Sequence, residues 1–209
     1  MGMTDLVERR IDGERLFDGR LLQVYRDRVR LPDGALAERE YIAHPGAVMI
    51  VPLLTEGATA DDLQLVLERQ YRYPVRRTMI EFPAGKLDAG EAALDCARRE
   101  LLEETGYRAA EWAPAGRVHV AIGYSDEVIE IWFARGLQQG QRHLDAGEFL
   151  DVFTASAAQL QRWCRSGEVT DSKTLVGALW LQNMLDGSWV PQWQRSTPAR
   201  TEGQHDENL

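Results

Sequence analysis

Alternation of apolar and polar side chains marks the first ordered stretch of the chain. Residues 22–31, LQVYRDRVRL, alternate with period two, which indicates a β-strand with one covered face. The PDG sequence at positions 32–34 favours a tight turn, and residues 35–43 supply a partner strand. We therefore predict a β-hairpin. Because an isolated two-stranded hairpin is marginal in water, it should dock on another surface.

Continuous apolar runs replace this alternation in the next part of the chain. Residues 47–54, AVMIVPLL, and 63–70, LQLVLERQ, are rich in branched side chains and predict buried strands. Residues 117–122, 127–135 and 149–155 are further apolar stretches that predict strands. The central part of the chain is therefore expected to form a sheet that is covered on both faces.

A helical period appears between residues 91 and 105. Leu94, Ala97 and Leu101 recur three and four positions apart, which places them on one stripe of an α-helix. Gly106 follows where a left-handed C-terminal cap belongs. This segment predicts an amphipathic helix with one buried face.

Two later helices and a polar end complete the expected architecture. Residues 157–167 and 172–185 have helical patterns, and residues 191–209 form a mostly polar C-terminal tail. Strands followed by helices interleaved with strands predict an α/β (α+β) fold with a mixed sheet. We expect an N-terminal β element at 1–45 and the main domain at 46–190.

Composition and charge narrow the class of protein. The 209 residues are 44% hydrophobic and 27% charged, which is typical of a globular domain rather than a disordered or disulfide-built chain. No stretch reaches the roughly 18 apolar residues of a membrane span, and the N-terminus lacks a secretory signal, so we expect a cytoplasmic protein. The net charge of −9 opposes binding to nucleic acid. An anionic substrate would need a local cation.

Three carboxylates on the helix at 91–105 are the main candidates for chemistry. Glu100, Glu103 and Glu104 occupy one sector of the helix surface. They are either an ordinary solvated acidic face or the ligands of a cation. Their place at the C-terminal end argues against the first interpretation, because the helix dipole disfavours negative charge there. Hard oxygen ligands select Mg²⁺, with Mn²⁺ as a substitute.

The same residues belong to a longer motif. Residues 85–107 read G-x5-E-x7-R-E-L-x-E-E-x-G-Y, which resembles the Nudix box at every fixed position. The resemblance implies the α/β/α Nudix sandwich. It also implies Mg²⁺-dependent hydrolysis of a nucleoside diphosphate linked to another moiety.

The resemblance also implies roles for individual residues. In this family the metal is bound by the residues that match Glu100 and Glu104, with help from Glu103. Arg99 matches an arginine that pairs with the box carboxylates and orients them. Ala84 matches the residue whose backbone carbonyl binds metal.

Segments beyond the box are similar to those of the ADP-ribose pyrophosphatases. They are HPGAV at 44–48, RQYRYP at 69–74 and EFPAGKLDAGE at 81–91. One position departs from that subgroup, because residues 121–123 read Ala-Ile-Gly where the subgroup has Ser-Pro-Gly. Ile122 therefore weakens the choice of substrate without affecting the chemistry.

Two arginines and one glutamate are carried over from the subgroup as substrate-binding residues. Arg39 and Arg72 match arginines that hold the phosphates or terminal ribose of the substrate, and Glu81 matches a residue near the nucleotide. A planar guanidinium suits phosphate oxygens, which agrees with this expectation.

An acid in a loop is expected to orient the attacking water. The subgroup recruits a glutamate from the loop that occupies residues 145–151 here, and Glu148 is the candidate for this catalytic role. The match is also open to Asp145 and Asp151, and a loop acid is often merely solvated.

The resemblance implies a homodimer, since the N-terminal β element of the family exchanges between subunits. The expected reaction converts ADP-ribose and water into AMP and ribose 5-phosphate. Another nucleoside diphosphate sugar such as GDP-mannose, or a dinucleotide, remains open as the substrate. A non-catalytic nucleotide sensor is the alternative from another class, and RNA decapping fits poorly with the acidic charge.

Overall fold

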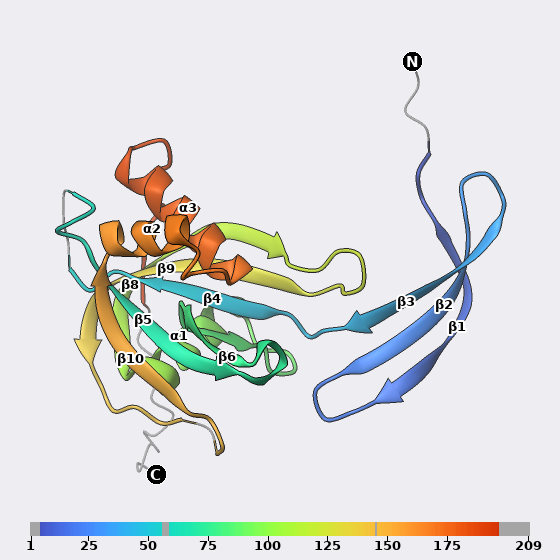
Figure 1. The fold of residues 1–209 in the computed structure, drawn as a ribbon, viewed down its shortest axis with the longest axis horizontal. Coiled ribbons are helices and arrows are strands. Elements are labelled where there is room, and N and C mark those ends of the chain that lie inside the picture. The colour runs from blue at the N-terminus through green and yellow to red at the C-terminus, as the bar shows by residue number, and fades with distance from the viewer. Residues whose placement is uncertain (1–4, 56–58, 145, 197–209) are drawn as a thin grey trace, which may run out of the picture.

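A three-stranded antiparallel sheet at the N-terminus projects away from the rest of the molecule (Figure 1). The computed structural model describes residues 5–55, 59–144 and 146–196. The strands are β1 (Arg9–Asp18), β2 (Gln23–Arg30) and β3 (Leu36–Ala43). The predicted hairpin is confirmed as β2 and β3. β1 was not predicted, because its few apolar residues follow no strand period and all ten residues are exposed.

A five-stranded mixed sheet forms the centre of the body, in the order β11-β8-β9-β4-β7. Its strands are β4 (Ala47–Pro52), β7 (Ala84–Lys86), β8 (Tyr107–His119), β9 (Val128–Gln139) and β11 (Gln194–Arg195). β4 and β9 are parallel, and the other neighbours are antiparallel. This arrangement confirms the predicted mixed sheet.

Both faces of β4 are covered, which explains its continuous apolar sequence. Val48 and Ile50 belong to the core cluster on one face of the sheet, whereas Met49 and Val51 belong to the cluster on the other. This alternation follows from the period of two in a strand.

A smaller antiparallel sheet packs beside the central one. It has the order β10-β5-β6 and consists of β5 (Gln64–Arg72), β6 (Arg77–Glu81) and β10 (Leu150–Ser156). A short 3₁₀ helix, Tyr73–Val75, joins β5 to β6. We predicted β5 and β10, but β6 is too short and polar to be recognised from its pattern.

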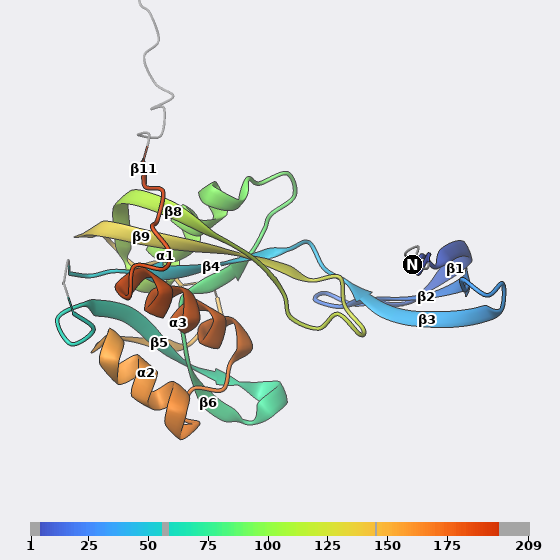
Figure 2. The same ribbon diagram turned by 90° about the horizontal axis from the view of Figure 1, so that it is seen from above.

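Helices pack on both faces of the central sheet, with α1 on one face and α3 on the other, while α2 packs against α3 and β10 (Figure 2). They are α1 (Ala93–Thr105), α2 (Ala157–Ser166) and α3 (Ser172–Leu185). Gly106 ends α1 with a φ of 76°, as the sequence predicts for a left-handed cap. Within the described residues, no helix has the length and apolar character needed to cross a membrane.

Two boundaries differ from the prediction. β8 begins at Tyr107, well before the strand expected at 117–122, and its pairing with β9 has an irregularity between Pro114 and Gly116. β11 pairs with Glu111 and Trp112 of β8 inside the segment expected to be a tail. Residues 197–209 of that tail lie outside the described residues.

Candidate active site

The C-terminal half of α1 lies directly against β7, and a glycine makes the approach possible. A Cβ atom added at Gly85 would overlap the carboxylate of Glu100. The backbone of Gly85 has no unusual φ, so the requirement for glycine comes from this close approach rather than from backbone strain. The first residue of the motif therefore makes room for one of its carboxylates.

Glu104 is a buried carboxylate rather than part of a solvated face. It is only 3% exposed, and the backbone N–H of Ala84 donates a 2.9 Å hydrogen bond to its Oε2. Burial raises the pKa of Glu104, and the charges of Glu68 and Glu100 raise it further. Burial also raises the pKa of Glu100, whose side chain is 13% exposed. Glu100 and Glu104 are therefore not part of an ordinary solvated acidic face.

Arg99 ties the acidic residues of the motif together. Its Nε and Nη2 each donate a 2.9 Å hydrogen bond to the two oxygens of Glu91. Its Nη1 donates to Glu100 at 2.7 Å and to Glu103 at 3.0 Å. The guanidinium lowers the pKa of Glu91 to about 2. Arg99 therefore fixes three carboxylates, as the family resemblance implies.

The donor set fits a divalent cation that retains bound water. Glu100 and Glu104 are two buried carboxylates one helical turn apart. Arg99 pairs with Glu100, whereas Glu104 forms no salt bridge with any of the described residues. Among the residues that the structure describes, no group of three His, Cys, Asp or Glu side chains has the arrangement of a complete metal cage. Mg²⁺ is bound through one or two carboxylates and keeps several waters, so it does not need such a cage.

Glu68 on β5 is a buried acid that the sequence analysis did not single out. It is 0% exposed, and neither carboxylate oxygen has a hydrogen-bond partner among the residues that the structure describes. It lies opposite Glu81 in the pairing of β5 with β6. Burial, followed by the charge of Glu81, raises its pKa. The signal available in the sequence was a charged residue inside the apolar run LQLVLERQ.

Arg72 and Lys173 form a basic cluster near the acidic helix α1. Arg72 binds Glu81 through two of its three guanidinium nitrogens, Nε to Oε1 at 2.7 Å and Nη2 to Oε2 at 2.9 Å. Lys173 of α3 also bonds to Glu81. A pocket lined by Arg72, Lys173, Ala84 and Gly85, among others, joins this cluster to the backbone that contacts α1. The structure thus brings Arg72 and Glu81 to the acidic site.

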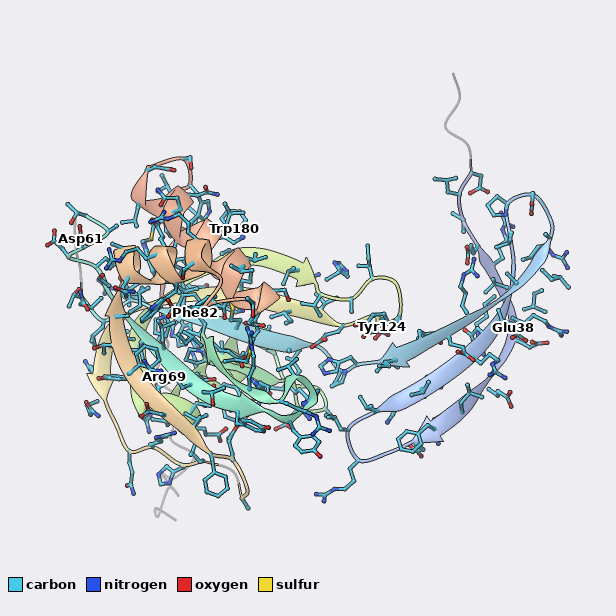
Figure 3. All side chains as sticks on the ribbon, in the orientation of Figure 1. Glu38, Asp61, Arg69, Phe82, Tyr124 and Trp180 are labelled. Carbon is cyan, nitrogen blue, oxygen red and sulfur yellow. The ribbon has the colours of Figure 1, made fainter. Side chains whose placement is uncertain are left out.

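Arg39 lies elsewhere within this chain. It is exposed on β3 and forms an ion pair with Glu8, through hydrogen bonds of 2.8 and 2.6 Å. Figure 3 shows Glu38, which precedes Arg39, on the projecting N-terminal sheet, and Phe82, which follows Glu81, inside the body. One chain alone therefore does not bring Arg39 to the site that contains Arg72.

Of the two candidate acids that the structure describes, Glu148 and Asp151, Glu148 lies near Glu100 and Glu104. Gln70 donates a 3.3 Å hydrogen bond to its Oε1, and its charge contributes to raising the pKa of Glu100 and Glu104. Asp151 instead pairs with Arg69 at 3.4 Å and has a side chain that is 72% exposed. Asp145 lies outside the described residues.

Comparison with known protein families matches two parts of the chain. Residues 43–175 match the NUDIX domain, and residues 8–42 match the nucleoside diphosphate sugar hydrolase N-terminal domain. The crystal structure of an ADP compounds hydrolase superposes with a TM-score of 0.75 over 87% of this chain and 95% of that chain. At 22% identity this likeness establishes the shared fold.

Several curated relatives match this chain over most of its length and over most of their own. The ADP-ribose pyrophosphatase of Bacillus subtilis is 35% identical over 86% of this chain and 95% of the relative. That of Mycobacterium tuberculosis is 34% identical over 87% and 86%. The methanol dehydrogenase activator of Bacillus methanolicus is 33% identical over 84% and 92%. With the NUDIX match spanning more than half of the sequence, this chain belongs to the Nudix family.

Proposed function

We propose that this protein is a Mg²⁺-dependent pyrophosphohydrolase that converts ADP-ribose and water into AMP and ribose 5-phosphate. The observation that carries the proposal is the buried carboxylate pair Glu100 and Glu104 beside a pocket that also contains Arg72 and Lys173. Relatives named ADP-ribose pyrophosphatase, similar over most of their length, support the choice of substrate.

Glu100, Glu104 and the backbone carbonyl of Ala84 are the groups that would hold Mg²⁺, with Glu103 assisting at the exposed edge. Mn²⁺ accepts the same oxygen ligands. A bound metal of this kind neutralises phosphate charge and lowers the pKa of bound water. The role of the protein is to hold the ligands in place. Arg99 does so for Glu100 and Glu103 by direct hydrogen bonds.

The remaining residues act on the substrate and on the attacking water. In the hydrolysis the water oxygen forms a bond to one phosphorus of the diphosphate, and the bridging P–O bond breaks to release two phosphate monoesters. Arg72 presents its guanidinium to the phosphates or the terminal ribose, while Glu81 orients it and lies near the nucleotide. Glu148 accepts a proton from the water or orients it, from the loop beside the acidic cluster.

A homodimer would supply Arg39, which a single chain leaves away from the pocket. The projecting sheet exposes apolar side chains such as Leu16, Phe17 and Leu36, which supports its docking on a second copy. We therefore include the exchange of residues 1–45 between subunits in the proposal. Light scattering of the full chain should give twice the mass of one chain. A monomer at micromolar concentration would remove Arg39 from the site.

The protein would act in the cytoplasm. Cys96 and Cys164 are both free thiols in the described part of the chain, which suits a reducing compartment.

A substrate panel tests the assignment. Initial rates with ADP-ribose, GDP-mannose, NADH and diadenosine polyphosphates in Mg²⁺ should give the highest kcat/KM for ADP-ribose, by about tenfold or more. Ile122, which replaces the proline of the subgroup, is the reason to include the other substrates. A higher value for GDP-mannose would move the proposal to another nucleotide sugar. Binding of ADP-ribose without turnover would indicate a sensor.

A further inference from the structure

Lys173 is a nearly buried lysine in the second position of α3 and comes from a part of the chain remote from the motif. It is 9% exposed. Its ammonium bonds to the carboxylate of Glu81 and donates to Oδ2 of Asp171 at 2.9 Å. A lysine is rarely buried unless it is paired, and here both partners are carboxylates. The lysine is therefore held in a fixed position.

The start of α3 is itself anchored to the end of β6. Asp171 caps the helix by accepting hydrogen bonds from the backbone N–H of Thr174 at 3.0 Å and from its hydroxyl at 2.6 Å. The hydroxyl of Thr174 in turn accepts a 3.1 Å hydrogen bond from the backbone N–H of Phe82. Gly177, one turn later, allows the helix to approach Met49 and Phe82 closely. These contacts set the position of Lys173 relative to Glu81.

Glu81 transmits this position to Arg72. Its carboxylate is 2% exposed and receives two arms of the Arg72 guanidinium as well as the ammonium of Lys173. Burial favours the neutral form of Glu81, but the hydrogen bond from Arg72 and the charge of Lys173 outweigh it and lower its pKa. Within the described residues, Nη1 of Arg72 has no hydrogen-bond partner. This nitrogen can therefore donate hydrogen bonds to a ligand in the pocket.

From these contacts we propose that Lys173 is a positioning residue, which fixes the Glu81 carboxylate and thereby aims the Arg72 guanidinium at the substrate. The inference rests on the proposed function, since it assigns the role to the same pocket. Without Lys173, Glu81 would lose the partner that joins it to α3. Arg72 would then sample several orientations before each binding event.

Steady-state kinetics of Lys173→Met with ADP-ribose test the proposal. We expect KM to rise about tenfold or more while kcat changes less than about threefold, because Arg72 contributes binding rather than chemistry. In the double variant Arg72→Ala/Lys173→Met, KM should equal that of Arg72→Ala alone. Additive effects of the two substitutions would mean that Lys173 acts independently of Arg72 and would overturn the proposal.

Lys86→Met is the matched control for loss of positive charge. Lys86 lines the same pocket but is exposed and has no side-chain hydrogen bond to Glu81. If Lys173 only attracted the anionic substrate, both variants would raise KM equally, and that result would contradict a positioning role. A normal KM in Lys173→Met would contradict it as well.

A substrate-free readout separates this inference from the proposed function. The Nε–H resonance of Arg72 in a ¹⁵N spectrum, identified by its loss in Arg72→Lys, should be sharp in the wild type and broadened or shifted in Lys173→Met. An unchanged resonance would refute the positioning role even if ADP-ribose is the substrate. If the wild type does not cleave ADP-ribose, the proposed function fails, while the resonance still decides whether Lys173 fixes Arg72. Thermal melts of each variant show whether the fold is retained.

Discussion

The backbone N–H of Ala84 donates a 2.9 Å hydrogen bond to Oε2 of Glu104, and 20 residues separate the two along the chain. This contact joins β7 to the acidic end of α1. It also leaves Oε1 of Glu104 without a hydrogen-bond partner in the described part of the chain. Burial together with nearby negative charge raises the pKa of this carboxylate, so its charged form is stabilised only when a cation lies beside it.

Substitution of Glu104 by Gln should abolish metal binding while preserving the fold. The amide keeps the shape of the side chain but removes the charge that attracts Mg²⁺. We expect kcat/KM to fall about 100-fold or more, since even indirect support of a metal ligand is worth that much. Calorimetric titration with Mg²⁺ and turnover assays measure both effects. Asp95→Asn, an exposed acid in the first turn of α1, should bind metal normally. Equal losses in both variants would contradict the assignment.

Substitution of Gly85 by Ala should weaken metal binding without unfolding the protein. The added Cβ would displace the carboxylate of Glu100, which is the flexible end of a side chain, while the backbone needs no change. Titration with Mg²⁺ should show a higher Kd, and the melting temperature in EDTA should stay close to that of the wild type. Gly123→Ala is the control, because its Cβ would meet no atom within 4 Å. An unchanged Kd in Gly85→Ala would be inconsistent with the structure.

The metal-free protein should lose stability as the pH rises from about 5 to 8. Burial and the charge of Glu81 raise the pKa of Glu68 from 4.5 to about 8, so between these values the folded state binds more protons than the unfolded state. Stability therefore falls with increasing pH, by at most about 1.4 kcal/mol per pH unit for this group. Denaturant unfolding in EDTA at several pH values measures the slope.

Glu68→Gln should reduce this slope and stabilise the metal-free protein at pH 8, because the amide is neutral at every pH. At pH 5 the wild type and the variant should have similar stability. A slope that is unchanged in Glu68→Gln would show that other groups control the pH dependence.

Substitution of Glu148 by Gln should slow turnover severely with little effect on metal binding. A group that accepts a proton from the attacking water contributes about 100-fold or more to the rate. We expect kcat to fall by this factor, and Asp151→Asn to retain activity because Asp151 is exposed and paired with Arg69. Wild-type rates in Glu148→Gln would remove this residue from the mechanism.

Local features of the site were predictable from the sequence, and long-range ones were not. Glu100 and Glu104 are one helical turn apart, so their common face follows from the period of the helix. Lys173 and Glu81 are 92 residues apart, and their contact depends on how α3 packs against β6. A local sequence pattern does not indicate which helix will pack against which strand.

Two other features of the site could not be predicted from the sequence, for physical reasons. Glu68 interrupts an apolar run, but only the pairing of β5 with β6 places it opposite Glu81. Arg39 was predicted to bind substrate on the basis of resemblance, yet within one chain it lies on β3, pairs with Glu8 and is remote from Arg72. The local sequence around Arg39 does not indicate this separation. The core strand β4, in contrast, was predicted correctly because both of its faces are buried.

The most direct test of metal-dependent hydrolysis at this site is mass-spectrometric analysis of the products formed from ADP-ribose in Mg²⁺, in EDTA and with Glu104→Gln. We predict AMP and ribose 5-phosphate in the first reaction and intact ADP-ribose in the other two. Equal product formation in EDTA, or full activity in Glu104→Gln, would contradict a metal-dependent site built on this acidic helix.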